Sequence, residues 1–241
     1  MDKKYLQDLY LLTGLPVPFQ NVGSLYQHKL LDIAQMGEDD FHRFLSITVF
    51  EIEDLEIEID TELEISTFDL VVGNCLQNTH FKTEAENALS FFFNERVRFN
   101  SEYGLFYIGE IDDMRIIHKE NYELLKEALK QIYYLSKQEK KEGKPVSEAA
   151  KRILEKQKES RKQLDKIKGR GRKEVQLSDL ISAFCANSNT SLKEVWNLTL
   201  YQFMDQFYRL QLVEDYDIKI RSVLAGADPK EVNPEHYVKK M

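Results

Sequence analysis

The sequence contains few of the residues that build extracellular scaffolds and membrane proteins. Its 241 residues include two cysteines, five prolines and one tryptophan. Cys75 and Cys185 show no CxxC spacing, which excludes a disulfide framework and is typical of a protein in a reducing compartment. No stretch reaches the roughly eighteen apolar residues of a membrane helix, and the N-terminus lacks the apolar run of a signal peptide. We therefore expect the protein to stay in the cytoplasm where it is made.

Patterns that carry catalytic or metal chemistry are also missing. The five histidines are scattered, and none forms an HxxxH pair: His28, His42, His80, His118 and His236. The segment GRGR lacks the Lys-Ser/Thr pair and the preceding strand of a phosphate-binding loop, and no GxSxG nucleophile motif occurs. We therefore predict that the protein is not an enzyme, has no catalytic residues and folds without a metal or a cofactor.

The composition is that of a folded globular protein. Apolar residues make up 42% of the chain and charged residues 31%, which argues against disorder of the whole chain. A length of 241 residues is enough for one large domain or two small ones. The net charge of −8 favours solubility and argues against a general nucleic-acid binder.

Charge is distributed unevenly along the chain. Between Lys137 and Lys173 there are 15 basic and 6 acidic residues, a net charge of +9, and the rest of the chain carries −17. Twelve acidic residues and one basic residue lie between Glu38 and Asp69. We expect the basic segment to form a partly helical arm, because its apolar seam is too thin for a core helix. The arm either stays in solvent or docks on the acidic region, and nucleic-acid binding is a weaker alternative because aromatic residues are absent from it.

The first part of the chain mixes helix and strand signals. Capping boxes at Ser24–Gln27 and Thr83–Glu86 predict helix starts, and Gly37 predicts a helix end. Because Phe91, Phe92 and Phe93 span more than half of a helix circumference, their helix is expected to be buried on two sides. Three short segments predict strands: VRFN, LFYIG and MRIIH. The segment ENYELLKEALKQIYYLSK predicts an amphipathic helix after them.

The segment LEIEIDTELEI, residues 55–65, has two readings. Its apolar residues alternate with acidic ones, which is the period of a strand. Ile52, Leu55, Ile59 and Leu63 also lie at helical spacing. Alternation accounts for more positions, so the pattern favours a strand.

The last part of the chain is predicted to be helical. Ser178 is expected to cap the segment DLISAFCAN, and Ser191–Glu194 and Thr199–Gln202 form capping boxes. A long helix is expected to begin near Leu200 and to end at Gly226.

This long helix carries more apolar surface than one docking face needs. One stripe consists of residues at helical spacing: Leu200, Phe203, Met204, Phe207 and Leu210. A neighbouring stripe is richer in tyrosine: Tyr201, Tyr208, Leu212 and Tyr216. One stripe is enough to dock a helix on a small core, so we predict a protein-binding surface on and beside this helix: Trp196, Tyr201, Phe203, Met204, Tyr208 and Leu212. The alternative is that another helix of the same chain covers both stripes.

Together these signals predict an α+β fold that is mostly helical. We expect three units along the chain. They are a mixed α/β N-terminal domain over residues 1–136, a basic, partly helical linker arm over 137–173, and a helical C-terminal domain with an extended tail over 174–241.

Three segments occur in this order along the chain: DIAQMGEDDFHRFL, ALSFFFNERVRF and VWNLTLYQFMDQFYRLQLVEDYDIKIRSVLAGAD. They resemble proteins encoded in the tail-assembly modules of tailed bacteriophages, near the tape-measure gene, many of which are described as tail assembly chaperones. WNLTLYQFMDQFYR is the most specific part of the resemblance. The resemblance covers about half of the chain, and the basic arm lies outside it.

The resemblance implies a non-enzymatic role in virion assembly in the bacterial host cytoplasm. Such chaperones bind the long, apolar tape-measure protein and keep it soluble until tube subunits polymerise around it. Two other functions fit the same residues. One is a structural baseplate or tail-completion protein of the virion. The other is an inhibitor of a host defence protein that uses the acidic segment EIEDLEIEIDTELEI as a decoy. Self-association is left open, and no membrane partner is expected.

Overall fold

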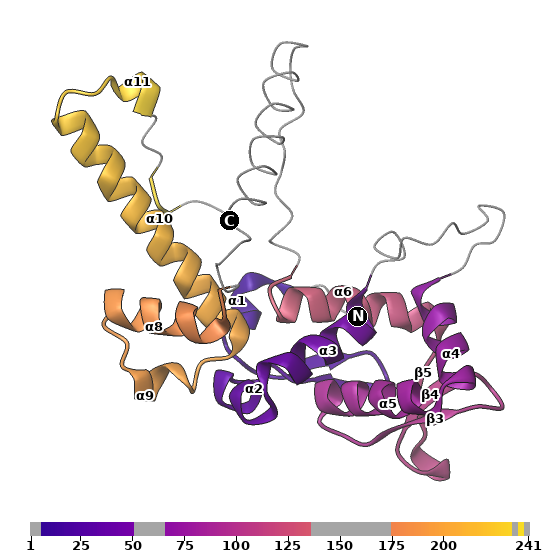
Figure 1. Ribbon diagram of the computed structural model, residues 1–241. Coiled ribbons are helices and arrows are strands. Elements are labelled where there is room, and N and C mark those ends of the chain that lie inside the picture. The colour runs from indigo at the N-terminus through magenta and orange to yellow at the C-terminus, as the bar shows by residue number, and fades with distance from the viewer. Residues whose placement is uncertain (1–5, 51–65, 136–174, 233–235, 239–241) are drawn as a thin grey trace, which may run out of the picture.

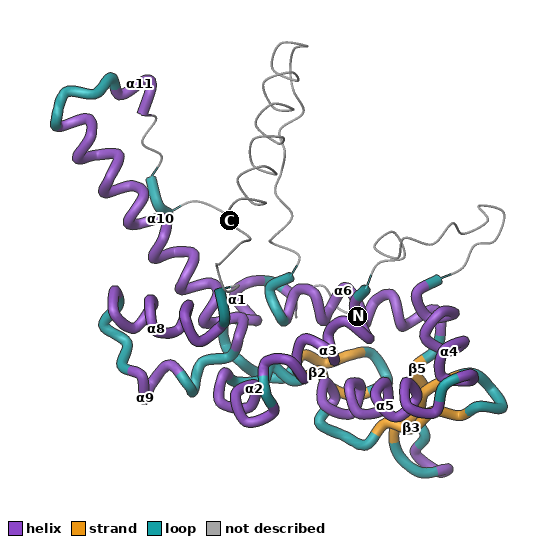
Figure 2. Tube along the Cα trace, viewed as in Figure 1, coloured by secondary structure: helices purple, strands orange, loops and turns teal. Residues whose placement is uncertain are grey.

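The computed structural model describes residues 6–50, 66–135, 175–232 and 236–238. Within these ranges the fold is mostly helical with two small antiparallel sheets, which confirms the predicted α+β class (Figures 1 and 2). The segment LEIEIDTELEI and the basic arm lie outside the described residues, so the predictions of a strand and of a linker helix there stay predictions.

The described chain begins with a short helix and a hairpin. Helix α1 (Asp8–Leu11) precedes strands β1 (Val17–Phe19) and β2 (Gly23–Leu25), which pair in an antiparallel register with Val17 opposite Leu25. Four helices follow: α2 (Leu30–Met36), α3 (Glu38–Val49), α4 (Thr67–Gln77) and α5 (Thr79–Phe93).

A three-stranded antiparallel sheet comes next, in the order β3 (Val97–Asn100), β4 (Leu105–Ile108) and β5 (Arg115–Ile117). These are the three predicted strands, and they are confirmed. A 3₁₀ turn, η3 (Ile111–Asp113), joins the last two. Helix α6 (Lys119–Ile132) follows as the predicted amphipathic helix, with Leu125 and Leu129 buried and Leu124 exposed.

Helix α5 lies at the centre of this arrangement. It packs against α3 and α4 and contacts strands β2 and β3. Phe92 and Phe93 are fully buried, and Phe91 stacks on the ring of His28 with 3.7 Å between centroids. The phenylalanine run is therefore covered from two sides, as the sequence predicted.

Two predicted helix starts are wrong. Ser24 lies in β2, opposite Pro18, and the helix begins only after Lys29, whose backbone N–H donates to Asp32 at 2.9 Å. Thr83 lies inside α5, where its hydroxyl donates to the Thr79 carbonyl oxygen. That helix begins after Asn78, whose side-chain oxygen accepts two backbone N–H groups of the first turn. Several residues could serve as caps, and the surrounding packing decides between them.

The C-terminal part consists of helices α8 (Leu177–Asn187), α9 (Leu192–Val195), α10 (Leu200–Leu224) and α11 (Pro229–Val232). The capping boxes at Ser191 and Thr199 are confirmed, because each hydroxyl accepts the backbone N–H three residues later. The cap predicted at Ser178 is wrong: α8 begins after Gln176, whose N–H donates to Asp179 at 3.1 Å.

Helix α10 ends where the sequence predicted. Gly226 adopts a positive φ of 104°, and its N–H donates to the Val223 oxygen at 3.0 Å. The N–H of Ala227 donates to the Ser222 oxygen at 3.1 Å. This pair of bonds is a Schellman motif, which satisfies the last carbonyl groups and turns the chain away from the helix axis.

Main-chain hydrogen bonds join the C-terminal part to the first part of the chain. The N–H of Leu30 donates to the Leu198 oxygen at 2.9 Å, and the N–H of Leu200 donates to the His28 oxygen at 3.2 Å. One apolar core contains residues of both parts, including Phe92 and Phe203. The two parts are thus packed together in the described structure, and the proposed domain boundaries at 136 and 174 stay a prediction.

Candidate functional site

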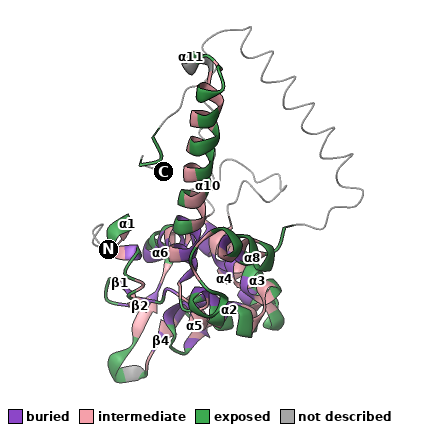
Figure 3. Ribbon diagram, turned by 90° about the vertical axis from the view of Figure 1, so that its left-hand side faces the viewer, coloured by how far each residue is buried: buried purple, intermediate pink, exposed green. Residues whose placement is uncertain are grey.

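The first half of α10, residues 200–210, is anchored in the body of the protein. Thr199 caps the helix, and the side-chain amide of Gln202 donates to the Leu12 oxygen at 2.8 Å. The buried residues of α10 all lie in its first two turns: Leu200, Tyr201, Phe203, Met204 and Asp205. Figure 3 shows that α10 is buried at its N-terminal end and becomes more exposed toward its C-terminal end.

Tyr134 lies between two tyrosines of this anchored half. Its ring makes an edge contact with Tyr201 (5.3 Å between centroids) and stacks on Tyr208 (5.4 Å between centroids, 15° between planes). The Tyr201 hydroxyl donates to the Asp8 carboxylate at 2.7 Å. Burial raises the pKa of Tyr134 and of Tyr201, and the bond to Asp8 raises that of Tyr201 further. Both phenols therefore stay protonated and act as packing and hydrogen-bonding groups.

A buried carboxylate sits one turn after Tyr201. Asp205 is 4% exposed, and the guanidinium of Arg209 donates to its oxygen at 3.0 Å. A buried charge without such a partner would be costly, so Arg209 compensates for the burial of Asp205.

Trp196 follows α9 and lies at the edge of the core. It is partly buried, and its backbone oxygen accepts the N–H of Leu31 at 3.2 Å. The tryptophan therefore belongs to the joint between α2 and the C-terminal part, with one portion of its side chain exposed.

The second half of α10, residues 211–224, leaves the body, and we call it the projecting half (Figure 1). All of its residues are described, and none of them is buried. Five partly exposed apolar side chains follow one side of it at helical spacing: Leu212, Val213, Tyr216, Ile220 and Val223. We call this set the apolar row. Ile218, which is 64% exposed, lies about 160° away around the helix from Ile220.

Two residues of the C-terminal tail contact the apolar row. The rings of His236 and Tyr237 lie 5.5 Å and 5.7 Å from that of Tyr216, measured between centroids. The two tail rings also stack on each other at 4.4 Å.

The structure separates the six predicted binding residues into two groups. Tyr201, Phe203 and Met204 are at most 8% exposed and pack in the chain's own core, so placing them on an exposed surface was wrong. The reason is that Tyr134, which follows α6, packs on Tyr201, and Phe184 of α8 packs on Phe203. Trp196, Tyr208 and Leu212 are partly exposed. Their role in binding a partner stays a prediction.

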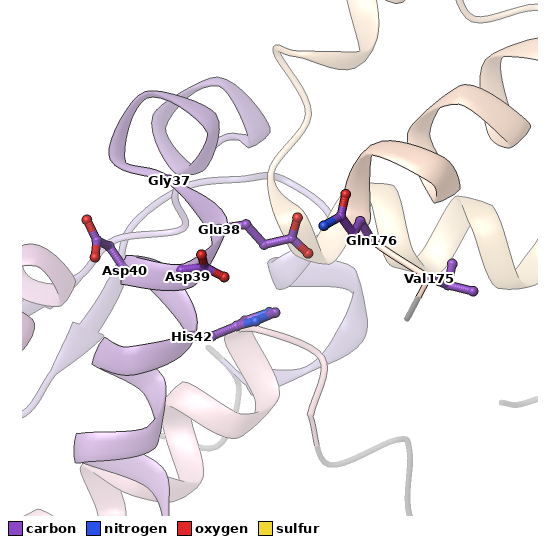
Figure 4. Close-up of a pocket in the computed structure, with 7 residues that line it drawn as sticks. All are labelled: Gly37, Glu38, Asp39, Asp40, His42, Val175 and Gln176. Carbon is purple, nitrogen blue, oxygen red and sulfur yellow. The ribbon is translucent and has the colours of Figure 1, made fainter. Parts of the chain in front are cut away.

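An acidic pocket lies between α3 and the start of α8 (Figure 4). It has a volume of about 730 Å³ and is lined by seven residues: Gly37, Glu38, Asp39, Asp40, His42, Val175 and Gln176. Glu38 accepts the N–H of Leu177 at 3.0 Å, and Asp40 pairs with Arg43 at 2.7 Å. Two of the three carboxylates thus already bind groups of the same chain.

A smaller, mostly apolar pocket of about 260 Å³ adjoins it and shares Glu38 and His42. Its other walls come from α3, α8 and α10, among them Phe41, Leu180 and Met204. Sequence reasoning missed both pockets. The acidic run at the start of α3 was visible in the sequence, but nothing there indicated that residues 175–177 would face it.

The described residues offer little for metal or thiol chemistry. Within the described ranges, no group of three or more His, Cys, Asp or Glu side chains is placed to hold a metal ion. Burial raises the pKa of the Cys75 thiol to about 12 and also raises the pKa of Cys185. Both cysteines are therefore held in the protonated form, which is the weaker nucleophile.

The described residues include several helices that are too short or too polar for a bilayer. None of their helices combines the length and the apolar character needed to cross a bilayer.

Part of the chain is similar to a known protein family. Residues 168–241 match a family model described as the YomV second domain, and this range contains α8, α9, α10 and α11. No curated protein and no solved structure matched the chain. This match suggests a phage protein.

Proposed function

We propose that the protein is a non-enzymatic tail assembly chaperone of a phage, which binds the tape-measure protein and keeps it soluble in the host cytoplasm. The observation that carries the proposal is the projecting half of α10. One half of this helix is fixed in the core, and the other presents an apolar row that no described helix buries. A row with this spacing fits an apolar helical segment of a client, which would lie along it.

Two further observations support the proposal. The family match covers all of α10 and suggests a phage protein, in agreement with the resemblance of the WNLTLYQFMDQFYR segment to tail-module proteins. The net charge of −8 would help to keep a complex with an apolar client in solution.

The proposal is tested by co-expression with the tape-measure protein encoded in the same phage genome. Ile220→Asp places a charge within the apolar row, and Ile218→Asp makes the same change on the opposite side of the helix. We expect the unchanged protein and Ile218→Asp to raise the soluble yield of the tape-measure protein and to co-purify with it. Ile220→Asp should lose both effects. Equal behaviour of the two variants would show that the apolar row does not bind this client.

A structural protein of the virion is distinguished by a second measurement. Mass spectrometry of purified virions should detect no peptides of this protein if it is an assembly chaperone, because such a chaperone leaves before the tail is complete. Stoichiometric amounts in the virion would contradict the proposed function and favour a baseplate or tail-completion protein.

A further inference from the structure

Two described residues of the C-terminal tail, His236 and Tyr237, reach one member of the apolar row, Tyr216. The Schellman motif at Gly226 ends the helix, and α11 follows directly. The rings of His236 and Tyr237 lie against Tyr216, in the middle of the projecting half. The contact thus joins the projecting half to a segment that lies about 20 residues later in the sequence.

The chemistry of this contact is that of a loosely held aromatic cluster. His236 and Tyr237 stack on each other, and both rings face Tyr216. Tyr237 is nevertheless 38% exposed, and His236 is exposed as well. The tail therefore covers part of the apolar row without being buried itself, and a ring contact of this kind shifts an equilibrium by about two- to tenfold.

We infer that His236 and Tyr237 form an intramolecular strap that occupies the apolar row in the free protein and is displaced when a client binds there. The identity of the client rests on the proposed function, whereas the strap itself rests on the contacts with Tyr216. The tail rings stand where apolar or aromatic side chains of a client segment would pack. Only molecules in which the row is uncovered can bind the client. The apparent affinity is therefore the intrinsic affinity multiplied by the fraction of such molecules.

The strap is tested in the full-length protein without any client. Hydroxyl-radical footprinting measures how fast each side chain is oxidised, and thus how exposed it is. We expect Tyr216 to be oxidised severalfold faster in a variant with His236→Ala and Tyr237→Ala together. Tyr103, which is 70% exposed and lies in the β3–β4 turn, serves as the internal reference. Val238→Ala is the matched control, because it changes the same tail without removing a ring from Tyr216.

The outcomes separate the strap from the proposed function. Unchanged oxidation of Tyr216 in the double variant would overturn the strap. Faster oxidation together with an up to tenfold higher affinity for the tape-measure protein would support the whole inference. Faster oxidation of Tyr216 with the same client affinity in the double variant and the unchanged protein would show that the strap does not compete with the client. Faster oxidation with no client binding by either protein would leave the strap in place and contradict the proposed function.

Discussion

The ring of Tyr134 stacks on the ring of Tyr208, with 15° between their planes. Tyr134 follows the last turn of α6, and Tyr208 lies where α10 leaves the body. The same Tyr134 ring makes an edge contact with Tyr201. These three tyrosines fix the base of the projecting half, so they determine how firmly the apolar row is held relative to the core.

The first prediction is that Tyr134 and Tyr208 are energetically coupled. Tyr134→Ala should cost about 3 kcal/mol of unfolding free energy because the ring is buried, and Tyr208→Ala should cost about 1 kcal/mol because it is half exposed. A double-mutant cycle from urea unfolding should give a coupling of about 0.5–1.5 kcal/mol, as expected for an aromatic pair. Strictly additive effects would show that the stacked geometry contributes nothing.

The second prediction concerns the hydroxyl of Tyr201. Tyr201→Phe keeps the ring and removes the bond to the Asp8 carboxylate, so it should lower the unfolding free energy by about 1.5–3 kcal/mol. Tyr10→Phe is a suitable comparison, because that hydroxyl donates to the neutral carbonyl oxygen of Pro16 at 3.0 Å. Its loss should cost about 1 kcal/mol. If both variants lose the same small amount, the bond to Asp8 has no special strength.

The third prediction is a loss of stability in mild acid that depends on His28. Its ring is stacked on Phe91, and its Nε2–H donates to the Phe91 oxygen at 2.8 Å. Burial lowers the pKa of His28 below the usual 6.5, and this outweighs the opposite effects of that bond and of Asp32. The unfolded chain therefore takes up a proton before the folded one does. The contribution of His28 to stability is complete above pH 6.5 and is lost as the pH falls through its folded pKa.

This pH dependence is measured by urea unfolding between about pH 7.5 and pH 5.5. His28→Gln retains an N–H donor and cannot titrate, so its stability should change less over the same range. An equally steep loss in the variant would place the titrating group elsewhere.

The fourth prediction compares two glycines. Gly226→Ala should destabilise the end of α10 by about 1–2 kcal/mol, because an L-residue rarely adopts a φ of 104°. Gly73→Ala should instead stabilise the protein by about 0.5–1 kcal/mol. Gly73 lies inside α4, and an added Cβ meets no atom within 4 Å. Hydrogen exchange at residues 222–227 reports the first effect and thermal unfolding the second. A lower melting temperature in Gly73→Ala, or unchanged hydrogen exchange at residues 222–227 in Gly226→Ala, would contradict these expectations.

Capping signals in the sequence predicted helix starts correctly where few neighbouring residues could serve as the N-cap. The capping boxes at Ser191 and Thr199 each stand just before an apolar run, and both cap helices in the structure. At Thr83 and Ser178 the helix instead begins a few residues earlier, after Asn78 and after Gln176, and the sequence alone does not rank these positions. Strands β1 and β2 were missed because each has only three residues, too few for a period to be visible.

The predicted binding residues on α10 fall partly in the core and partly at the surface, and the sequence could not separate the two groups. Periodicity identified the two stripes of α10, but it does not say which element covers which stripe. The structure leaves apolar side chains partly exposed on α10, but most of them lie further along the helix than the predicted surface. Tyr201 belongs to the core because Tyr134 packs on it, and that contact depends on tertiary structure. Phe207, assigned to the docking stripe, is only partly buried.

The hydrogen bond from Leu30 to Leu198 has a consequence for how the protein is made. During synthesis the N-terminal residues leave the ribosome first, and the N–H of Leu30 then has no native partner until Leu198 has been translated. Likewise, the His28 carbonyl oxygen lacks its native donor, the N–H of Leu200, until Leu200 has been translated. The nascent chain therefore exposes apolar residues of its unfinished core until the segment around Leu198 and Leu200 has been translated. Chaperone demand, and losses to aggregation, should be concentrated in that interval.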